Sequence, residues 1–146
     1  MSIFTRFLLM KSVLVTGRSN VQLNMLKCKI HRATVTHAEL DYEGSVAIDG
    51  HLLDSAGIST YEQIHVWNIT NGERFVTYAL RAEEGSGIIS VNGSAARRVS
   101  TGDLLIIAAF ILVPHDEFLG YHPELVYVDA ANRITRMSSS IPKQMA

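Results

Sequence analysis

The chain has 146 residues, of which 47% are hydrophobic, and its formal net charge is −1. This length fits one domain with a substantial core, and the near-neutral charge gives no electrostatic case for binding nucleic acid or a membrane surface. Cys28 is the only cysteine, which excludes an intramolecular disulfide framework and a multi-cysteine zinc site. A reducing cytoplasm is therefore the expected location.

The first 24 residues resemble an extension more than a part of the fold. Their apolar run, 7–10, is interrupted by Lys11 too early for a secretory signal. We therefore predict a disordered extension over residues 1–24, with Met25 as an internal start, and a single domain over residues 25–146. The longest later apolar run, 104–113, is too short to span a bilayer and predicts a buried strand.

From residue 26 onward the sequence alternates with the period of a strand. Apolar side chains at 26, 28 and 30 alternate with Lys27, Lys29 and His31, so the last two are expected on the polar face of a strand that ends near Thr36. A solvated sheet edge is the alternative role for both. Residues 49–57 then predict one or two helical turns that end at Gly57.

The clearest local signal is a hairpin over residues 61–80. Two alternating runs flank Asn71-Gly72, the preferred pair for a two-residue type I′ turn. This turn pairs residue 65 with 78, 67 with 76 and 69 with 74. One face of the hairpin then carries His65, Trp67, Ile69, Arg74, Val76 and Tyr78. That face is a candidate anion pocket or, alternatively, a cation–π stack on an exposed sheet, and Thr77 lies on the opposite face.

The remaining chain predicts further short strands separated by turns. Residues 87–93 predict a strand that ends in a tight Asn-Gly turn, and the small side chains at 94–96 allow a close backbone approach to a ligand, a loop or short helix start being the alternative. Another strand is expected at 124–129, and the polar tail from Asn132 is expected to be loosely held. Strands outnumber helices, which predicts a mainly β fold, a small closed or partly closed barrel.

A Gly-Ser bond at the start of a strand is one of the few peptide bonds that a protein can cut in itself. Gly44 can adopt twisted conformations closed to other residues, which lets the hydroxyl of Ser45 approach the Gly44 carbonyl carbon. The tripeptide Glu-Gly-Ser occurs twice, at 43–45 and 84–86, so the motif alone leaves open an ordinary turn. The six histidines lack metal-ligand spacing, so no metal is expected.

Most of the chain resembles the bacterial aspartate decarboxylase family. The matching segments are Lys29–Arg32, Val35–Ala38, Leu40–Ser45, Ala47–Asp49, Val66–Asn68, Thr70–Gly72, Arg74–Phe75, Thr77–Tyr78 and Ile88–Gly93. The resemblance implies a double-psi β-barrel with short helices, and a homotetramer with active sites at the subunit interfaces. It also implies that L-aspartate is decarboxylated to β-alanine for pantothenate synthesis. Some relatives need an accessory maturation protein, and the sequence leaves this open here.

The resemblance further implies a proenzyme cut between Gly44 and Ser45. The products are a β chain, 1–44, and an α chain, 45–146, headed by a covalent pyruvoyl group made from Ser45, which replaces pyridoxal phosphate as the electron sink. The carried-over roles are catalysis for Ser45 and Tyr78, substrate binding for Lys29, Arg74, Thr77, Gly93, Ser94 and Ala95, and support for His31, Tyr42, Trp67 and Asn92. Tyr78 is the implied proton donor.

Two departures from the family pattern are mild. Val46 stands where cysteine is common, and Ser94 stands where alanine is usual; neither removes a group that the implied chemistry needs. Two alternatives to a pyruvoyl enzyme stay open. One is a non-enzymatic β-barrel binding module that is never processed, and the other is a serine hydrolase that would combine Ser45 with His31 and Asp49.

Overall fold

A computed structural model describes residues 20–146, and its elements are mainly strands, as the sequence predicts. In chain order the elements are β1 (Gln22–Thr34), β2 (His37–Glu39), β3 (Val46–Asp49), α2 (Gly50–Ala56), β4 (Gln63–Asn68), β5 (Arg74–Ala82), β6 (Ile89–Asn92), the 3₁₀ helix η1 (Gly93–Arg98), β7 (Leu104–Pro114), η2 (His115–Glu117), β8 (Glu124–Val128) and β9 (Ile134–Ser138). The described residues form two compact units, 20–25 with 112–121 and 26–111 with 122–146.

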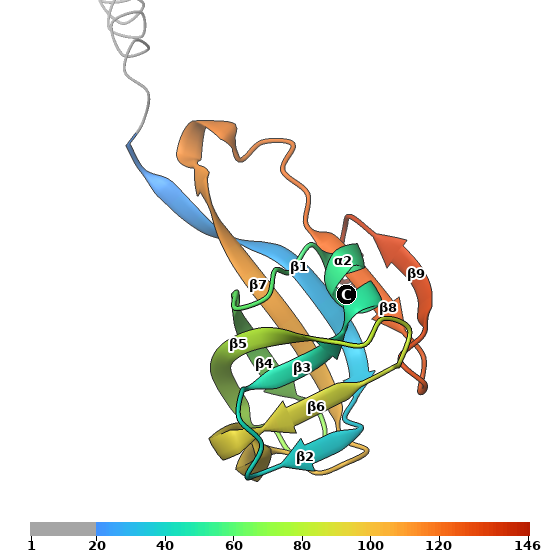
Figure 1. Ribbon diagram of the computed structural model, residues 1–146. Coiled ribbons are helices and arrows are strands. Elements are labelled where there is room, and N and C mark those ends of the chain that lie inside the picture. Colours follow the sequence, from blue (N-terminus) through green and yellow to red (C-terminus); the bar gives the residue numbers. More distant parts are fainter. Residues whose placement is uncertain (1–19) are drawn as a thin grey trace, which may run out of the picture. The chain divides into compact units, whose positions relative to one another are not determined.

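The strands form a mixed sheet with the order β2-β6-β3-β5-β4-β7-β1-β8-β9. Strand β3 pairs parallel with β5 on one side and antiparallel with β6 on the other, and Figure 1 shows β3, β6 and β2 side by side. Parallel pairs also join β1 to β8 and β2 to β6. These connections are consistent with a β-barrel, and the double-psi crossing stays a prediction.

The first strand begins earlier in the chain than the sequence predicts. Residues 1–19, which make up most of the predicted disordered extension, lie outside the described part of the chain. Residues 22–24 already belong to β1, so ordered structure begins before the predicted boundary at Met25. Within the smaller unit the backbone N–H of His115 donates to the carbonyl of Val21 over 2.9 Å.

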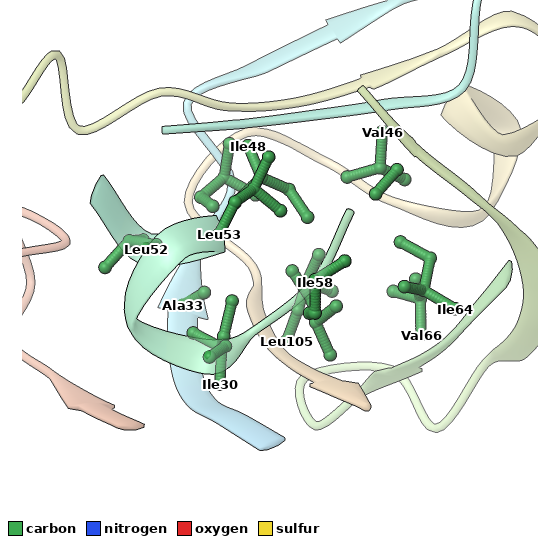
Figure 2. Packing of buried hydrophobic residues seen from close by; sticks show 14 of the residues in the cluster. Ile30, Ala33, Val46, Ile48, Leu52, Leu53, Ile58, Ile64, Val66 and Leu105 are labelled. Atoms are coloured by element: carbon green, nitrogen blue, oxygen red, sulfur yellow. The ribbon is translucent and has the colours of Figure 1, made fainter. Parts of the chain in front are cut away.

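The core follows the alternation read from the sequence. In β1, Cys28 and Ile30 are buried while Lys29 and His31 are partly exposed, so the predicted polar face is confirmed. Figure 2 shows Ile30 in one cluster with branched side chains from β3, α2, β4 and β7. Strand β7 begins buried, but Ile111 and Leu112 near its end are exposed, so the prediction of a buried strand holds only for its first half.

The predicted hairpin face is confirmed, but the register differs by two residues. Trp67 pairs with Arg74, and Tyr78 pairs with Gln63. The side chain of Asn68 accepts hydrogen bonds from the backbone N–H groups of Thr70 and Asn71, which builds a longer loop than a type I′ turn. Because a shift of two residues keeps every side chain on its face, only Ile69 leaves the predicted set, and it lies in the loop.

The first part of the C-terminal tail, residues 132–138, is held in place, contrary to the sequence-based prediction, whereas residues 139–146 are exposed and form no helix or strand. Strand β9 pairs antiparallel with β8. Asn132 is 2% exposed, and its side chain donates to the carbonyls of Thr34 and Gly87 over 2.9 and 2.8 Å and accepts from the Thr34 N–H. A single buried amide thus ties the tail to two distant segments, which composition alone does not reveal.

The short helix α2 is fixed at both ends by its sequence. Asp49 caps its first turn by accepting from the His51 N–H over 2.9 Å, and Gly57 ends it in the left-handed conformation. The predicted helix and its stop are confirmed. Within residues 20–146, no helix combines the length and apolar character needed to cross a membrane.

Asp49 also organises the second Glu-Gly-Ser copy. Its carboxylate accepts from the N–H groups of Gly85 and Gly87, each over 2.8 Å, and Asp49 is only 3% exposed. Burial opposes the charged form, but the hydrogen bonds from Gly87, His51 and Gly85 together lower the pKa of this carboxyl below its ordinary value of 3.8.

Asp49→Asn should lower the free energy of unfolding at neutral pH by about 1–3 kcal/mol, because a charged acceptor of three N–H groups is lost. Since the folded-state pKa is depressed, this stabilisation is present above the unfolded pKa and is lost as pH falls below it. Urea titrations at pH 7 and pH 3 should therefore show a smaller difference at pH 3. Asp54→Asn, in the same helix, breaks an exposed ion pair with Arg81, which contributes little to stability. It is the control, and an equal effect there would contradict the assignment.

Candidate functional site

A cavity of about 580 Å³ lies in the larger unit, beside the bond between Gly44 and Ser45. It is formed where the segment before β3 passes the edge of β5 and the start of η1. The residues that line it are Tyr42, Glu43, Gly44, Ser45, Phe75, Val76, Thr77, Tyr78, Asn92, Gly93, Ser94, Ala95 and Arg98. Nine of the thirteen site residues predicted from the sequence are in this set: Tyr42, Gly44, Ser45, Thr77, Tyr78, Asn92, Gly93, Ser94 and Ala95.

The backbone at Gly44 adopts a conformation that L side chains rarely tolerate. Its φ angle is +104°, and a Cβ atom added there would overlap Cδ1 of Leu80. Leu80 therefore packs against the face of Gly44 that a side chain would occupy. Ser45 follows with only 6% of its surface exposed, so the Gly44-Ser45 bond is held in one unusual conformation.

The hydroxyl of Ser45 makes a close contact with the hydroxyl of Thr77, and either group can donate. Thr77 and Tyr78 lie on opposite faces of β5, as the hairpin pattern predicts, yet both line the cavity. The explanation is the edge of β5. Strand β3 pairs with residues 79–82 of β5, and among residues 20–146 no strand pairs with the same edge of residues 74–78. Side chains from both faces of β5 can therefore border one space there.

Asn92 and Gly93 approach the same bond from β6 and η1. The backbone N–H of Asn92 donates to the Ser45 carbonyl over 2.9 Å. Gly93 has a φ angle of +63°, and a Cβ there would lie 3.7 Å from the Gly44 carbonyl oxygen. The expected tight Asn-Gly turn is instead the start of η1, which agrees with the helix-start alternative and turns residues 93–95 toward the cavity.

Asn92 also carries a polar atom without a protein partner. The residue is 2% exposed, and its Oδ1 accepts from the Ser90 hydroxyl over 2.8 Å. Its Nδ2 is buried and has no hydrogen-bond partner among residues 20–146. A buried amide donor without a partner is costly, and one that borders a cavity is suited to a ligand or a developing negative charge.

Four predicted site residues do not line this cavity. Arg74 lies over the ring of Trp67, with Cζ 4.6 Å from the ring centroid, which is the cation–π arrangement offered as the alternative. Lys29 and His31 lie on β1. The His31 ring meets Tyr127 edge-on at 5.4 Å, and its pKa is lowered by burial and by the charges of nearby Lys29, Arg32 and Arg136.

The second Glu-Gly-Ser copy has a different environment. The N–H groups of Gly85 and Gly87 bind the Asp49 carboxylate, and Ser86 donates its hydroxyl to the Glu83 carbonyl. These contacts make it a turn. They also occupy Asp49, so the hydrolase combination of Ser45, His31 and Asp49 is not assembled in this protomer. Among residues 20–146 there is no group of three metal-ligating side chains.

Sequence reasoning missed several residues at the site, of which Leu80 and Arg98 are the most informative. Leu80 is an ordinary strand residue by pattern, and its contact with Gly44 depends on the parallel pairing of β3 with β5. Arg98 is one of two consecutive arginines, and only the winding of η1 distinguishes the one that lines the cavity from its neighbour. Neither role had a local sequence signal.

Comparison with known proteins identifies the family. The family model for aspartate decarboxylase matches residues 21–135, so the chain belongs to the aspartate decarboxylase family. The chain is 62% identical over 126 residues to an aspartate 1-decarboxylase of Xylella fastidiosa strain M12, covering 86% of this chain and 100% of that protein. It is 61% identical, with the same coverage, to an aspartate 1-decarboxylase of Xanthomonas campestris pv. campestris strain B100. A third, from Thioalkalivibrio sulfidiphilus, is 61% identical over 124 residues, covering 85% of this chain and 98% of that protein.

Gly44→Ala should destabilise the fold by about 1–3 kcal/mol, because a side chain must enter a left-handed conformation and displace Leu80. Gly85→Ala is the control, since Gly85 also has a positive φ but no atom lies within 4 Å of its added Cβ. Thermal unfolding should show the larger loss for Gly44→Ala, and adding Leu80→Ala should restore part of it. Equal losses at both glycines would show that the Leu80 contact is unimportant.

Proposed function

We propose that this protein is a self-processing, pyruvoyl-dependent aspartate 1-decarboxylase that converts L-aspartate to β-alanine and CO₂ for pantothenate synthesis. The observation that carries the proposal is the Gly44-Ser45 bond, which lies in a cavity with the Ser45 hydroxyl against Thr77. Membership of the aspartate decarboxylase family supports the choice of substrate.

The first reaction is cleavage of the chain by its own serine. The Ser45 Oγ attacks the Gly44 carbonyl carbon, the peptide C–N bond breaks, and the hydroxyl proton passes to the released nitrogen, leaving an ester. Loss of the Ser45 Cα proton with cleavage of the Cβ–Oγ bond then frees the Gly44 carboxylate. Water hydrolyses the remaining unsaturated amine, and ammonia leaves behind a pyruvoyl group on the chain 45–146.

The residues around the bond fit this chemistry. Thr77 can hydrogen-bond to the Ser45 hydroxyl and direct it toward the carbonyl carbon. The unpartnered Nδ2 of Asn92 is a donor available for the oxygen that gains negative charge during attack. Gly93 lies beside the Gly44 carbonyl oxygen, since a Cβ added there would be 3.7 Å from that oxygen.

When formed, the pyruvoyl group supplies an electron sink for the carbanion left by CO₂ without an added cofactor, metal or pyridoxal phosphate. Tyr78 borders the cavity and returns a proton to the substrate α-carbon. General acid catalysis of this kind contributes typically about 10²–10⁴-fold. The backbone of residues 93–95 holds the substrate through main-chain polar groups, and Tyr42, which also lines the cavity, has a supporting role.

The charged partners for the substrate carboxylates come from a second copy of the chain. Arg74, Trp67, Lys29 and His31 lie on strands outside the cavity of their own protomer. In a homotetramer with active sites at subunit interfaces, these side chains complete the neighbouring protomer's cavity. Arg74 then binds a carboxylate bidentately with Lys29 as a second cation, while Trp67 and His31 support them.

Denaturing mass spectrometry should find chains corresponding to 1–44 and 45–146, the second lighter than a serine-started chain by the elements of ammonia. Ser45→Ala should remain one chain and have no decarboxylase activity, because the attacking hydroxyl is missing. Ser86→Ala, in the second Glu-Gly-Ser copy, is the matched control and should cleave normally.

Three results would argue against the proposal in different ways. Decarboxylation by uncleaved Ser45→Ala would exclude the pyruvoyl assignment. A wild-type chain that stays intact after warming and after incubation with cell extract would favour the unprocessed binding module. Cleavage without the mass deficit would mean hydrolysis of the ester, which leaves Ser45 a serine.

Tyr78→Phe should be cleaved at the normal rate but lose about 10²–10⁴-fold in kcat, because only the proton donor is removed. Tyr121→Phe, at a tyrosine that does not line the cavity, should keep full turnover. Rates of cleavage by gel and of β-alanine formation should be measured on the same samples. If Tyr78→Phe blocks cleavage instead, Tyr78 acts in maturation.

A further inference from the structure

The cavity carries few charged side chains for a substrate with two carboxylates. Among the described residues that line it, Arg98 is the basic side chain and Glu43 the acidic one. Neither belongs to the set of site residues carried over from the family. A charge on a cavity wall changes the local concentration of small ions and hence the apparent affinity for them. The location of Arg98 therefore calls for a functional explanation.

The main chain at Arg98 is anchored independently of its side chain. Arg98 is the last residue of η1, the segment that begins with Gly93. Its carbonyl accepts from the side-chain amides of Asn71 and Asn68 over 3.0 and 3.3 Å. A substitution that changes only the guanidinium should therefore leave the path of η1 and its approach to the cavity intact.

The guanidinium of Arg98 forms an ion pair with the carboxylate of Glu73. The two side chains are 55% and 42% exposed, so the pair contributes little to stability. Glu73 does not line the cavity. The pair therefore places a cation at the cavity wall and partly offsets its charge from the outer side.

We propose that Arg98 is a specificity-determining residue that attracts small dicarboxylates into the cavity, and that Glu73 moderates this attraction. The inference rests on the proposed function for the identity of the substrate class, and it adds a cation supplied by the same protomer as Ser45. A purely structural role for Arg98, holding the loop 68–73 against η1, is the alternative. That role would depend on the ion pair with Glu73, whereas the proposed role depends on the positive charge of Arg98.

Neutralising Arg98 and neutralising Glu73 should have opposite effects on dicarboxylate binding. Arg98→Gln removes the positive charge and should weaken dicarboxylate binding by about three- to tenfold at low ionic strength. Glu73→Gln breaks the same ion pair but frees the positive charge, and should strengthen binding by about twofold. Added salt should reduce both differences, because screening acts on exposed charges.

The test is isothermal titration calorimetry of succinate, a dicarboxylate without the reacting amine, against the full-length protein and its variants. Arg97→Gln is the matched control, because Arg97 is the adjacent arginine of η1 and does not line the cavity. We expect weaker binding for Arg98→Gln, stronger binding for Glu73→Gln and unchanged binding for Arg97→Gln. In the decarboxylation assay, Arg98→Gln should raise KM with little change in kcat.

Several results would overturn the inference. One is wild-type protein that does not bind succinate. Another is an equal weakening of succinate binding in Arg98→Gln and Arg97→Gln. A third is an equal weakening in Arg98→Gln and Glu73→Gln, which would indicate that the ion pair has a structural role. Failure of the proposed function is a separate result. It would appear as absent chain cleavage and absent β-alanine formation, whereas the succinate titration reports on Arg98 in cleaved and uncleaved protein alike.

Discussion

The position of the peptide group between Gly44 and Ser45 is the constraint on which the site depends. Leu80 packs against Gly44 where a side chain would be, and the Ser45 carbonyl accepts from the Asn92 N–H. One contact comes from β5 and the other from β6, the two strands that flank β3. The parallel and antiparallel partners of a single short strand thus fix the Gly44-Ser45 bond from both sides.

Much of this arrangement could be predicted from the sequence, and the exceptions have physical causes. Alternation correctly placed Lys29 and His31 on one face of β1, and Arg74 with Tyr78 on one face of the hairpin. The hairpin register was wrong because the Asn68 side chain competes for backbone N–H groups of the loop. Pattern reasoning assigns a residue to a face, but whether a strand has a free edge is a tertiary property.

The C-terminal tail and the cavity show the same limit of prediction from sequence patterns. Asn132 was expected in a loose tail, yet its buried amide joins residues 34 and 87. Similarly, the face assigned to Thr77 was correct, but its contact with Ser45 followed from the end of the β3–β5 pairing at residue 79. The hydrophobic pattern of a sequence does not predict hydrogen bonds between distant segments. These bonds nevertheless decide which of the predicted site residues come into contact.

The two Glu-Gly-Ser copies have identical letters but different surroundings, Leu80 and Thr77 at one and Asp49 at the other. The proposed reactivity at Gly44 would therefore be a property of the assembled sheet and not of the tripeptide. If the chain cuts itself as proposed, a newly made or misfolded chain has no means of doing so. Cleavage then serves as a folding checkpoint, since only a chain whose β3, β5 and β6 have come together acquires the group that makes it an enzyme.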